Sequence, residues 1–269
     1  MQNQSDARED CVFGRNAVLE ALKSERPADA LYIARGEHNG SVGVILALAR
    51  ERGVVVKEAD RRKLEQLSGG GNHQGVVLMA AARAYAELED LFALAQSRGE
   101  EPFFLICDEI EDPHNLGAML RTAEAAGAHG VIVPRHRSAP LSQAVAKASA
   151  GAVEYIPVAR VANLAAAIEE IKEQGVWVYG ADMRGEPYDA KPLTGAIALV
   201  IGSEGKGLGR LVRERCDGLL ALPMKGKIGS LNASVAAGVL LYEVARLRRA
   251  IGCAAAEKSI PKLESATGD

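Results

Sequence analysis

Three polar or glycine-rich segments, each next to an apolar run, contain the residues whose chemistry is most informative. They are residues 115–121 (NLGAMLR), 201–208 (IGSEGKGL) and 223–234 (PMKGKIGSLNAS). The first combines an amide, Asn115, with a guanidinium, Arg121, which can hold a phosphate through two parallel hydrogen bonds. The second presents the carboxylate of Glu204 in a glycine-lined turn. The third leaves backbone amides around Ser230 and Asn232 free to meet a ligand.

The first segment opens a helix expected over residues 116–126. Its apolar residues follow helical spacing and should face a sheet: Leu116, Met119, Leu120 and Ala123. Arg121 lies about 100° from that stripe. Gly117, one turn earlier, would leave room for the guanidinium to lie back over the helix start. Alternatively, Asn115 or Asp112 is only a helix cap and Arg121 is a solvated cation.

The second segment resembles a phosphate-binding loop at first sight, but it fits none of the standard patterns. A Walker A loop needs glycine where the chain has Val200, and serine or threonine where it has Gly207. No GxGxxG follows a strand, and Ser203 is not in a GxSxG elbow because Glu204 follows it directly. What remains is a turn that presents Glu204, whose plain structural role would be to cap a helix starting near Gly207.

The third segment is a loop before the longest expected helix, residues 233–249. Asn232 or Ser234 could cap that helix. A capped helix would account for Asn232, but it would not account for the closely spaced glycines and lysines before it.

In this order and spacing the three segments resemble the motifs of the TrmH family of SPOUT-class RNA 2′-O-ribose methyltransferases. The likeness covers residues 103–249, with a further match at 13–22 (FGRNAVLEAL), and is greatest to the branch that methylates a guanosine in 23S ribosomal RNA. It implies S-adenosylmethionine as methyl donor, no metal, and a homodimer formed through the C-terminal helix. The implied catalytic residues are Asn115, Arg121, Glu204, Ser230 and Asn232. The implied cofactor-binding residues are Gly180, Ala181, Ile201, Gly202, Leu222, Ile228, Ser230 and Leu231.

The elements that must position these residues form a regular pattern after residue 102. Strands are expected at 103–108, 130–134, 154–158, 176–181, 197–202 and 218–222. Helices are expected at 116–126, 140–149, 161–173, 207–215 and 233–249. This α/β alternation predicts a mostly parallel sheet with helices on both faces. Ligands of such sheets bind beyond the carboxyl ends of the strands, where all three segments fall. The resemblance adds a deep trefoil knot, which general rules of chain topology would not predict.

The rest of the chain divides into segments of different character. Residues 1–10 are polar and expected to be disordered, and residues 11–80 alternate short helices and strands as a small α/β domain. By resemblance this domain binds the RNA substrate. An alanine-rich segment, 81–101, with a helix expected at 87–96, should connect the domains at variable separation. The methyltransferase domain should span 102–252, with a flexible tail at 253–269.

Composition limits the classes of function. The chain has 269 residues, 48% of them hydrophobic, which suits two domains, and its net charge of −3 means that RNA must be held by local basic patches. Candidate patches are Arg135, Arg137 and Lys147; Lys225 and Lys227; and Arg246, Arg248 and Arg249. No apolar run approaches a membrane span, the start lacks a signal peptide, and the four cysteines form no CxxC pair, so a cytoplasmic location is expected. The histidines show no metal-ligand spacing, and the acidic stretch 108–112 is interpreted as a solvated strand end with a helix-opening aspartate.

The sequence therefore predicts a methyltransferase that acts on a ribose 2′-hydroxyl. That hydroxyl is a poor nucleophile at neutral pH, so the enzyme must place it in line with the donor methyl and help to remove its proton. Arginine is hard to deprotonate, so Arg121 is expected to orient and stabilise charge. The alternatives are a transfer RNA methyltransferase and a non-enzymatic, RNA-binding ribosome assembly factor. The intact motifs weigh against the assembly factor.

Overall fold

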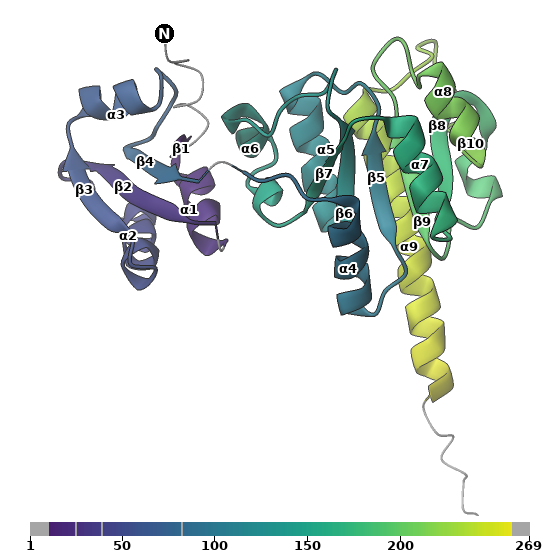
Figure 1. The fold of residues 1–269 in the computed structure, drawn as a ribbon, viewed down its shortest axis with the longest axis horizontal. Coiled ribbons are helices and arrows are strands. Elements are labelled where there is room, and N and C mark those ends of the chain that lie inside the picture. Colours follow the sequence, from purple (N-terminus) through teal and green to yellow (C-terminus); the bar gives the residue numbers. More distant parts are fainter. Residues whose placement is uncertain (1–10, 25, 39, 82, 260–269) are drawn as a thin grey trace, which may run out of the picture.

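The computed structural model describes residues 11–24, 26–38, 40–81 and 83–259 of the 269-residue chain. The expected disordered start, residues 1–10, lies outside the described residues, as do residues 260–269 of the expected tail. Two separate sheets, each flanked by helices, account for the fold (Figure 1). None of the helices in the described part of the chain combines the length and the hydropathy needed to span a bilayer.

The N-terminal sheet has the strand order β1-β4-β2-β3. Its strands are β1 (Cys11–Phe13), β2 (Ala28–Ala34), β3 (Val55–Ala59) and β4 (Val76–Ala80). β2 and β3 are parallel, whereas β4 pairs antiparallel with both β1 and β2. Helices α1 (Arg15–Lys23) and α2 (Ser41–Glu51) pack on one face, and α3 (Arg61–Leu67) packs on the other. The predicted small α/β domain is therefore present, with β1 as a short strand that the sequence pattern did not indicate.

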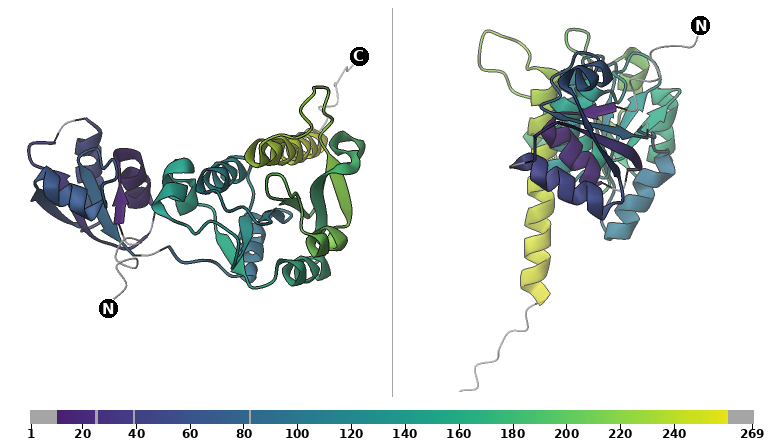
Figure 2. Two further views of the ribbon diagram at one scale, coloured as in Figure 1. Left: turned by 90° about the horizontal axis from the view of Figure 1, so that it is seen from above. Right: turned by 90° about the vertical axis from the view of Figure 1, so that its left-hand side faces the viewer.

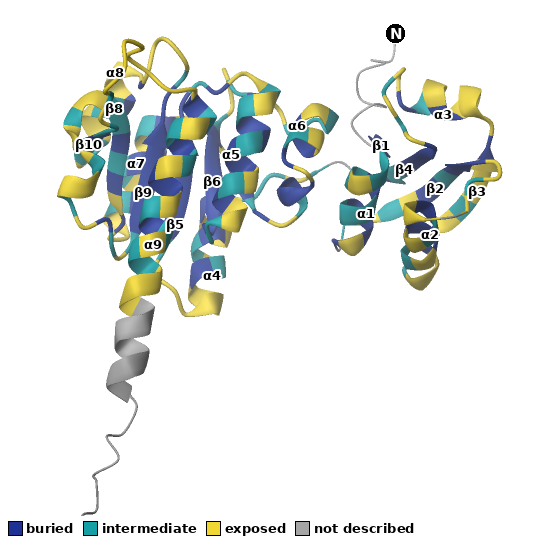
Figure 3. Ribbon diagram, turned by 180° about the vertical axis from the view of Figure 1, so that it is seen from behind, coloured by how far each residue is buried: buried dark blue, intermediate teal, exposed yellow. Residues whose placement is uncertain are grey.

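The C-terminal sheet has six strands in the order β10-β8-β9-β5-β6-β7, and all of its pairs are parallel. The strands are β5 (Phe103–Cys107), β6 (Gly130–Pro134), β7 (Val158–Val161), β8 (Trp177–Pro187), β9 (Ile197–Ile201) and β10 (Gly218–Ala221). Every residue of β5 and β9 is buried, because helices cover both faces of the sheet (Figure 3). This confirms the predicted parallel architecture.

Two groups of helices cover the faces of this sheet. On one face lie α5 (Pro113–Ala125), α6 (Gln143–Ala148) and α9 (Ala233–Ser259). On the other face lie α4 (Leu88–Arg98), α7 (Leu164–Glu173) and α8 (Arg210–Arg215). The helix α9 runs ten residues beyond the expected end at 249, so the first residues of the expected tail are helical. The knot stays a prediction.

Local backbone geometry explains where the elements differ from expectation. The strand expected at 154–158 is a short 3-10 turn at Ala152–Glu154 followed by β7 from Val158. Ala150 and Gly151 both have positive φ, which turns the chain away from an extended path. The helix expected from 207 begins only at Arg210, because Gly205 and Gly207 adopt left-handed conformations.

The connecting segment contains a helix that belongs to the second sheet. In α4, Leu88, Leu91 and Ala95 are buried, and the ring of Phe92 packs edge-on against Phe104 with centroids 5.0 Å apart. The helix expected at 87–96 within the connection is therefore present, and it packs against the second sheet as part of the C-terminal domain.

The two domains are joined by a buried ion-pair cluster, which we call the Glu154 clamp. The carboxylate of Glu154 lies 3.4 Å from Arg26 Nη1 of the N-terminal domain and 3.0 Å from Arg83 Nε of the connection. These side chains are only 4%, 8% and 7% exposed, respectively. Nearby, Tyr155 donates a hydrogen bond of 2.5 Å to Glu20. The expectation of variable separation was wrong, because a sequence does not show which charges are buried together.

Candidate active site

A cavity of about 750 Å³ lies at the carboxyl ends of β8, β9 and β10, on one side of the larger sheet. Its walls come from the second half of β8, from the segments that follow β9 and β10, and from the start of α9. Figure 2 shows the N-terminal domain lying to one side of the domain that contains this sheet. Six of the expected cofactor-binding residues line it: Ala181, Ile201, Gly202, Leu222, Ser230 and Leu231. The sheet edge predicted from the strand pattern is therefore where these residues meet.

The glycine-rich turn after β9 packs tightly against itself. A side chain at Gly202 would place its Cβ 2.2 Å from the carbonyl carbon of Gly207, so only glycine fits there. The turn is closed by a 2.9 Å hydrogen bond from Gly207 N to Ser203 O. The backbone amide of Gly209 anchors the turn by donating to Asp108 Oδ2 at 2.7 Å.

Asp108 differs from the prediction for the acidic stretch. Its side chain is not at a solvated strand end but is buried, and burial raises the pKa of this carboxyl. The other acidic residues of the stretch are not buried. Glu109 pairs with Arg137, and Asp112 caps α5 by accepting from His114 N at 2.9 Å. The predicted helix-opening aspartate is therefore Asp112, which leaves Asn115 free for other contacts.

One hydrogen-bonded network joins the three sequence segments. Asn115 Nδ2 donates to Glu204 Oε1 at 3.0 Å, and Asn232 Nδ2 donates to Asn115 Oδ1 at 2.9 Å. Asn232 Nδ2 is also in close contact with Glu204 Oε1, which accepts as well from Ala233 N at 3.3 Å. A carboxylate and two amides that lie far apart in the chain thus form a single cluster beside the cavity.

This network also fixes the start of α9. Asn232 Oδ1 accepts from Ser234 N at 3.0 Å and from Val235 N at 3.3 Å, so Asn232 is the N-cap. Glu204 caps the same helix through Ala233 N, and not α8 as its plain structural role suggested. A carboxylate at a helix N-terminus is further favoured by the helix dipole.

Arg121 lies on α5, six residues after Asn115, and its side chain is exposed. It forms no hydrogen bond or ion pair with any residue that the structure describes. The explanation offered for Gly117 was wrong: its missing Cβ would lie 2.4 Å from Ala148 Cβ and 2.9 Å from Ser149 N. The space at Gly117 is therefore filled by the close approach of α6 and not by the guanidinium of Arg121.

Two expected cofactor-binding residues are not part of the cavity wall. Gly180 faces the opposite core, where a Cβ would lie 2.6 Å from Leu208 Cδ1 and 3.1 Å from Cys216 Sγ. Ile228 is 75% exposed in the loop before α9. Ser230 does line the cavity, but its side chain has no hydrogen bond to the described residues.

An ion-pair cluster on the cavity wall was missed from the sequence. Asp182 accepts from Arg184 Nη2 at 2.9 Å and from Arg213 Nε at 2.9 Å, and all three residues line the cavity. The hydrogen bonds from Arg184 and the nearby charge of Arg213 hold the pKa of Asp182 well below its usual range. The strand was expected to end at residue 181, but β8 continues to Pro187 and carries Asp182 to the cavity.

The basic patches proposed from the sequence have different roles. Arg248 donates to the carbonyls of residues 101, 102 and 195 and lies over the ring of Phe103, so it fastens α9 to the sheet. Arg246 pairs with Glu243. Lys147, Lys225 and Lys227 are exposed and available to a polyanion.

Substitutions at Asn232 should separate its capping role from its role in the network. Asn232→Ala should cost about 1 kcal/mol through the lost cap and should lower methyl transfer. Asn232→Ser restores a good cap, but its shorter side chain with a single O–H cannot replace the amide's bonds to both Asn115 and Glu204, so it should melt near the wild-type temperature while activity stays low. Thermal unfolding and methyl transfer would be measured on both variants. Normal turnover in Asn232→Ser would show that the network has no part in the reaction.

Comparison with known proteins agrees with this geometry. Residues 102–242 match the SpoU rRNA Methylase family, and residues 11–86 match the domain described as RNA 2'-O ribose methyltransferase substrate binding. YacO of Bacillus subtilis, named as a TrmH family tRNA/rRNA methyltransferase, is 53% identical over 90% of this chain and 98% of its own length. A protein of the same description from Staphylococcus haemolyticus is 42% identical over 90% of this chain and 97% of its own.

Solved structures share the whole two-domain arrangement. The SpoU methyltransferase AviRb from Streptomyces viridochromogenes, in complex with AdoMet, has a TM-score of 0.75 and 25% identity over 93% of this chain and 95% of its own. An AdoMet-bound rRNA methyltransferase from Sinorhizobium meliloti has a TM-score of 0.73 and 26% identity over 92% of this chain and 90% of its own. Since the family match spans more than half of the chain and its relatives match nearly all of it, this protein belongs to the SpoU rRNA methylase family of RNA methyltransferases.

Proposed function

We propose that the protein transfers a methyl group from S-adenosylmethionine to the ribose 2′-hydroxyl of a guanosine in 23S ribosomal RNA. The observation that carries this proposal is the convergence of Asn115, Glu204 and Asn232 in one network beside a cavity. Membership of the SpoU family and the match of residues 11–86 to a substrate-binding domain support it.

The cavity fits S-adenosylmethionine. Its volume is within the range of about 300–1,000 Å³ typical of small-molecule sites. Ile201, Leu222 and Leu231 offer apolar surface for an adenosine group, and the absent Cβ at Gly202 leaves backbone groups close to a ligand. The Asp182 cluster adds charged groups to the same wall. When bound, this cofactor supplies a methyl group already activated by a sulfonium centre, so the protein's own residues act on the acceptor hydroxyl.

The residues around the cavity would orient the ribose and stabilise charge. Glu204 Oε1 already accepts from Asn115, Asn232 and Ala233 N, so its role is to hold the two amides in place and not to act as a free base. Fixed dipoles of this kind lower the cost of reorganisation during reaction. Arg121 would hold the phosphate next to the reacting ribose. The hydroxyl proton would pass to an RNA phosphate or to water, because arginine remains protonated.

The nature of the RNA can be tested directly. The purified protein would be incubated with labelled S-adenosylmethionine and unmodified 23S ribosomal RNA or transfer RNA, and the methylated nucleotide would be mapped. We expect label on a ribose 2′-oxygen of a 23S guanosine. Label only in transfer RNA would favour the tRNA enzyme. Donor binding with no transfer to either RNA would favour an assembly factor. An absence of donor binding, measured by calorimetry, would contradict the proposal itself.

We also propose that the protein forms a homodimer through α9. Leu240, Leu241 and Val244 of α9 are fully buried against the sheet. On another side, Val235, Val239 and Tyr242 are 50%, 39% and 54% exposed and follow helical spacing. A second apolar stripe on a helix that is already packed indicates a partner surface.

Val239→Glu should therefore convert the dimer to a monomer in sedimentation at micromolar concentration. Val44→Glu, which changes a similarly exposed valine of α2 in the N-terminal domain, is the matched control and should leave the dimer intact. A wild-type protein that sediments as a fully active monomer would refute the dimer.

A further inference from the structure

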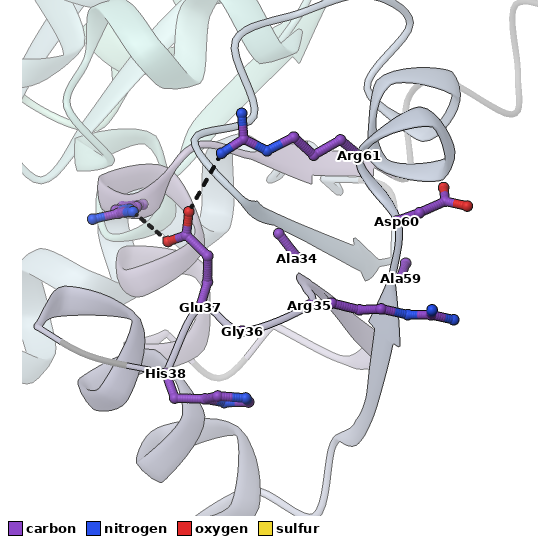
Figure 4. A pocket seen from close by; sticks show the side chains of 9 residues that line it. Ala34, Arg35, Gly36, Glu37, His38, Ala59, Asp60 and Arg61 are labelled. Carbon is purple, nitrogen blue, oxygen red and sulfur yellow. Dashed lines mark hydrogen bonds and ion pairs between the residues drawn. The ribbon is translucent and has the colours of Figure 1, made fainter.

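A second cavity, of about 450 Å³, lies in the N-terminal domain (Figure 4). It opens where the parallel strands β2 and β3 end, at Ala34 and Ala59. The loop 35–38 and the first residue of α3, Arg61, form much of its wall. None of the three sequence segments contributes to it, and it lies in a different domain from the cavity beside β9.

Two of the charged side chains in this cavity are held in fixed positions. Arg15 Nη2 pairs with Glu37 Oε2 at 2.8 Å, and Arg15 Nε donates to the carbonyl of Gln74 at 3.0 Å. The other oxygen of Glu37 faces Arg61 Nη2 at 3.8 Å, so Glu37 lies between two guanidinium groups (Figure 4). The negative charge of Glu37, the one carboxylate in the loop 35–38, is therefore already paired with the positive charge of Arg15.

Two cations remain available to a ligand. Arg35 is exposed and, among the described residues, its guanidinium has no hydrogen bond or ion pair. The side chain of Arg61 is 82% exposed and has only the long contact to Glu37. Asp60, the other acidic residue of the wall, uses Oδ1 to cap α3 through Lys63 N at 2.8 Å. Arg15, Arg35 and Arg61 thus outnumber Glu37 and Asp60, and the cavity has a surplus of positive charge.

We propose that this cavity binds one unpaired nucleotide of the substrate RNA, with backbone phosphates of the RNA held by the exposed guanidinium groups of Arg61 and Arg35 on opposite sides of the cavity (Figure 4). This inference deepens the proposed function, on which it rests, by assigning an RNA contact site within the substrate-binding domain. Guanidinium groups bind phosphate through paired, charge-assisted hydrogen bonds. The volume suits a single base and sugar.

The remaining wall suits a base. Proteins read unpaired RNA by taking up splayed bases, which stack on aromatic rings or on guanidinium planes. The cavity offers both kinds of planar group in Arg15 and His38. Arg15 is pre-organised for this because its bonds to Glu37 and Gln74 fix it without a ligand. A net charge of −3 over the whole chain is compatible with RNA binding when the basic groups are gathered in this way.

The test compares Arg35→Ala and Arg61→Ala with Arg62→Ala in the full-length protein. Arg62 is the next residue on α3, is also exposed and does not line the cavity, so it is a matched control for loss of one surface charge. Binding to unmodified 23S ribosomal RNA and transfer RNA transcripts would be measured without cofactor, over a range of salt concentrations. Arg35→Ala and Arg61→Ala should each weaken binding on the order of tenfold and lower the salt slope by about 0.7–0.9. Arg62→Ala should change neither.

Further measurements separate this site from a loss of folding and from the chemistry. Melting temperature and S-adenosylmethionine affinity should stay at wild-type values, and the KM for RNA should rise while kcat is unchanged. Wild-type RNA affinity and salt slope in both cavity variants would overturn the site, and so would an equal loss in Arg62→Ala. If the cavity variants lose binding but the wild-type protein methylates neither RNA, the proposed function fails and the site stands.

Discussion

Arg121→Ala is expected to abolish methyl transfer while S-adenosylmethionine affinity and melting temperature stay at wild-type values. The side chain is exposed on α5 and forms no hydrogen bond or ion pair with the described residues, so its removal should not disturb the fold. Loss of one well-placed charge-stabilising donor typically lowers turnover by about 100- to 1,000-fold. Single-turnover transfer and calorimetry would check the two halves of this prediction.

Two controls sharpen the test of Arg121. Arg121→Lys keeps the charge but not the paired hydrogen-bond geometry, so it should recover only part of the activity. Arg98→Ala removes another exposed arginine, from α4 on the opposite face of the sheet, and should leave turnover unchanged. Activity of Arg121→Ala within a few-fold of wild type would leave Arg121 as a surface cation with no role in the reaction.

Gly202→Ala should abolish cofactor binding and destabilise the protein. The added methyl group would lie within 2.5 Å of three backbone atoms of Gly207 and Leu208, so the turn after β9 could not close. Overpacking of this kind typically costs about 1–3 kcal/mol. It should also displace Glu204, two residues later, from Asn115 and Asn232. Calorimetry with S-adenosylmethionine and thermal unfolding would measure both effects.

Gly226→Ala is the matched control for this substitution. Gly226 lies in the loop before α9, where an added Cβ meets nothing within 4 Å. It should bind S-adenosylmethionine with wild-type affinity. Normal binding by Gly202→Ala would mean that the turn does not have to close for the cofactor to bind, which would remove the main support for the cavity as a cofactor site.

Much of the C-terminal domain could be predicted because its signals are local. Apolar runs such as Phe103–Cys107 and Ile197–Ile201 predicted buried parallel strands, and the rule for the carboxyl edge placed Glu204 near Asn115 and Asn232. The hydrogen bonds that join these residues span 28 to 117 positions of the chain. The order of the three segments, together with the rule that ligands bind at the carboxyl ends of parallel strands, was enough to predict that these residues lie close together. Which atoms are hydrogen-bonded to which was not predictable.

The features that were missed depend on contacts between distant segments. Gly117 is glycine because α6 crosses α5 there, and nothing in residues 115–121 indicates that crossing. Asp108 anchors Gly209 from 101 residues away, and Arg248 binds the carbonyl groups of residues 101 and 102, which lie 147 and 146 positions earlier in the chain. For Asp108 and Arg248, a polar residue beside apolar ones has two interpretations, solvated or buried with a partner. Only the folded chain decides between them.

The Glu154 clamp gives the molecule a fixed internal length. The ion pair between Arg26 and Glu154 and the hydrogen bond between Tyr155 and Glu20 both cross between the domains, so the cavity with Arg35 and the cavity beside β9 should keep one separation in solution. An RNA that fills both cavities must then present an unpaired nucleotide and a target ribose at one set spacing. The protein would then select its substrate by the distance, in the folded RNA, between the nucleotide bound in the N-terminal cavity and the target ribose. The bases next to the methylated ribose would matter less. A short stem-loop with the correct target sequence would reach only the cavity beside β9 and would remain unmodified.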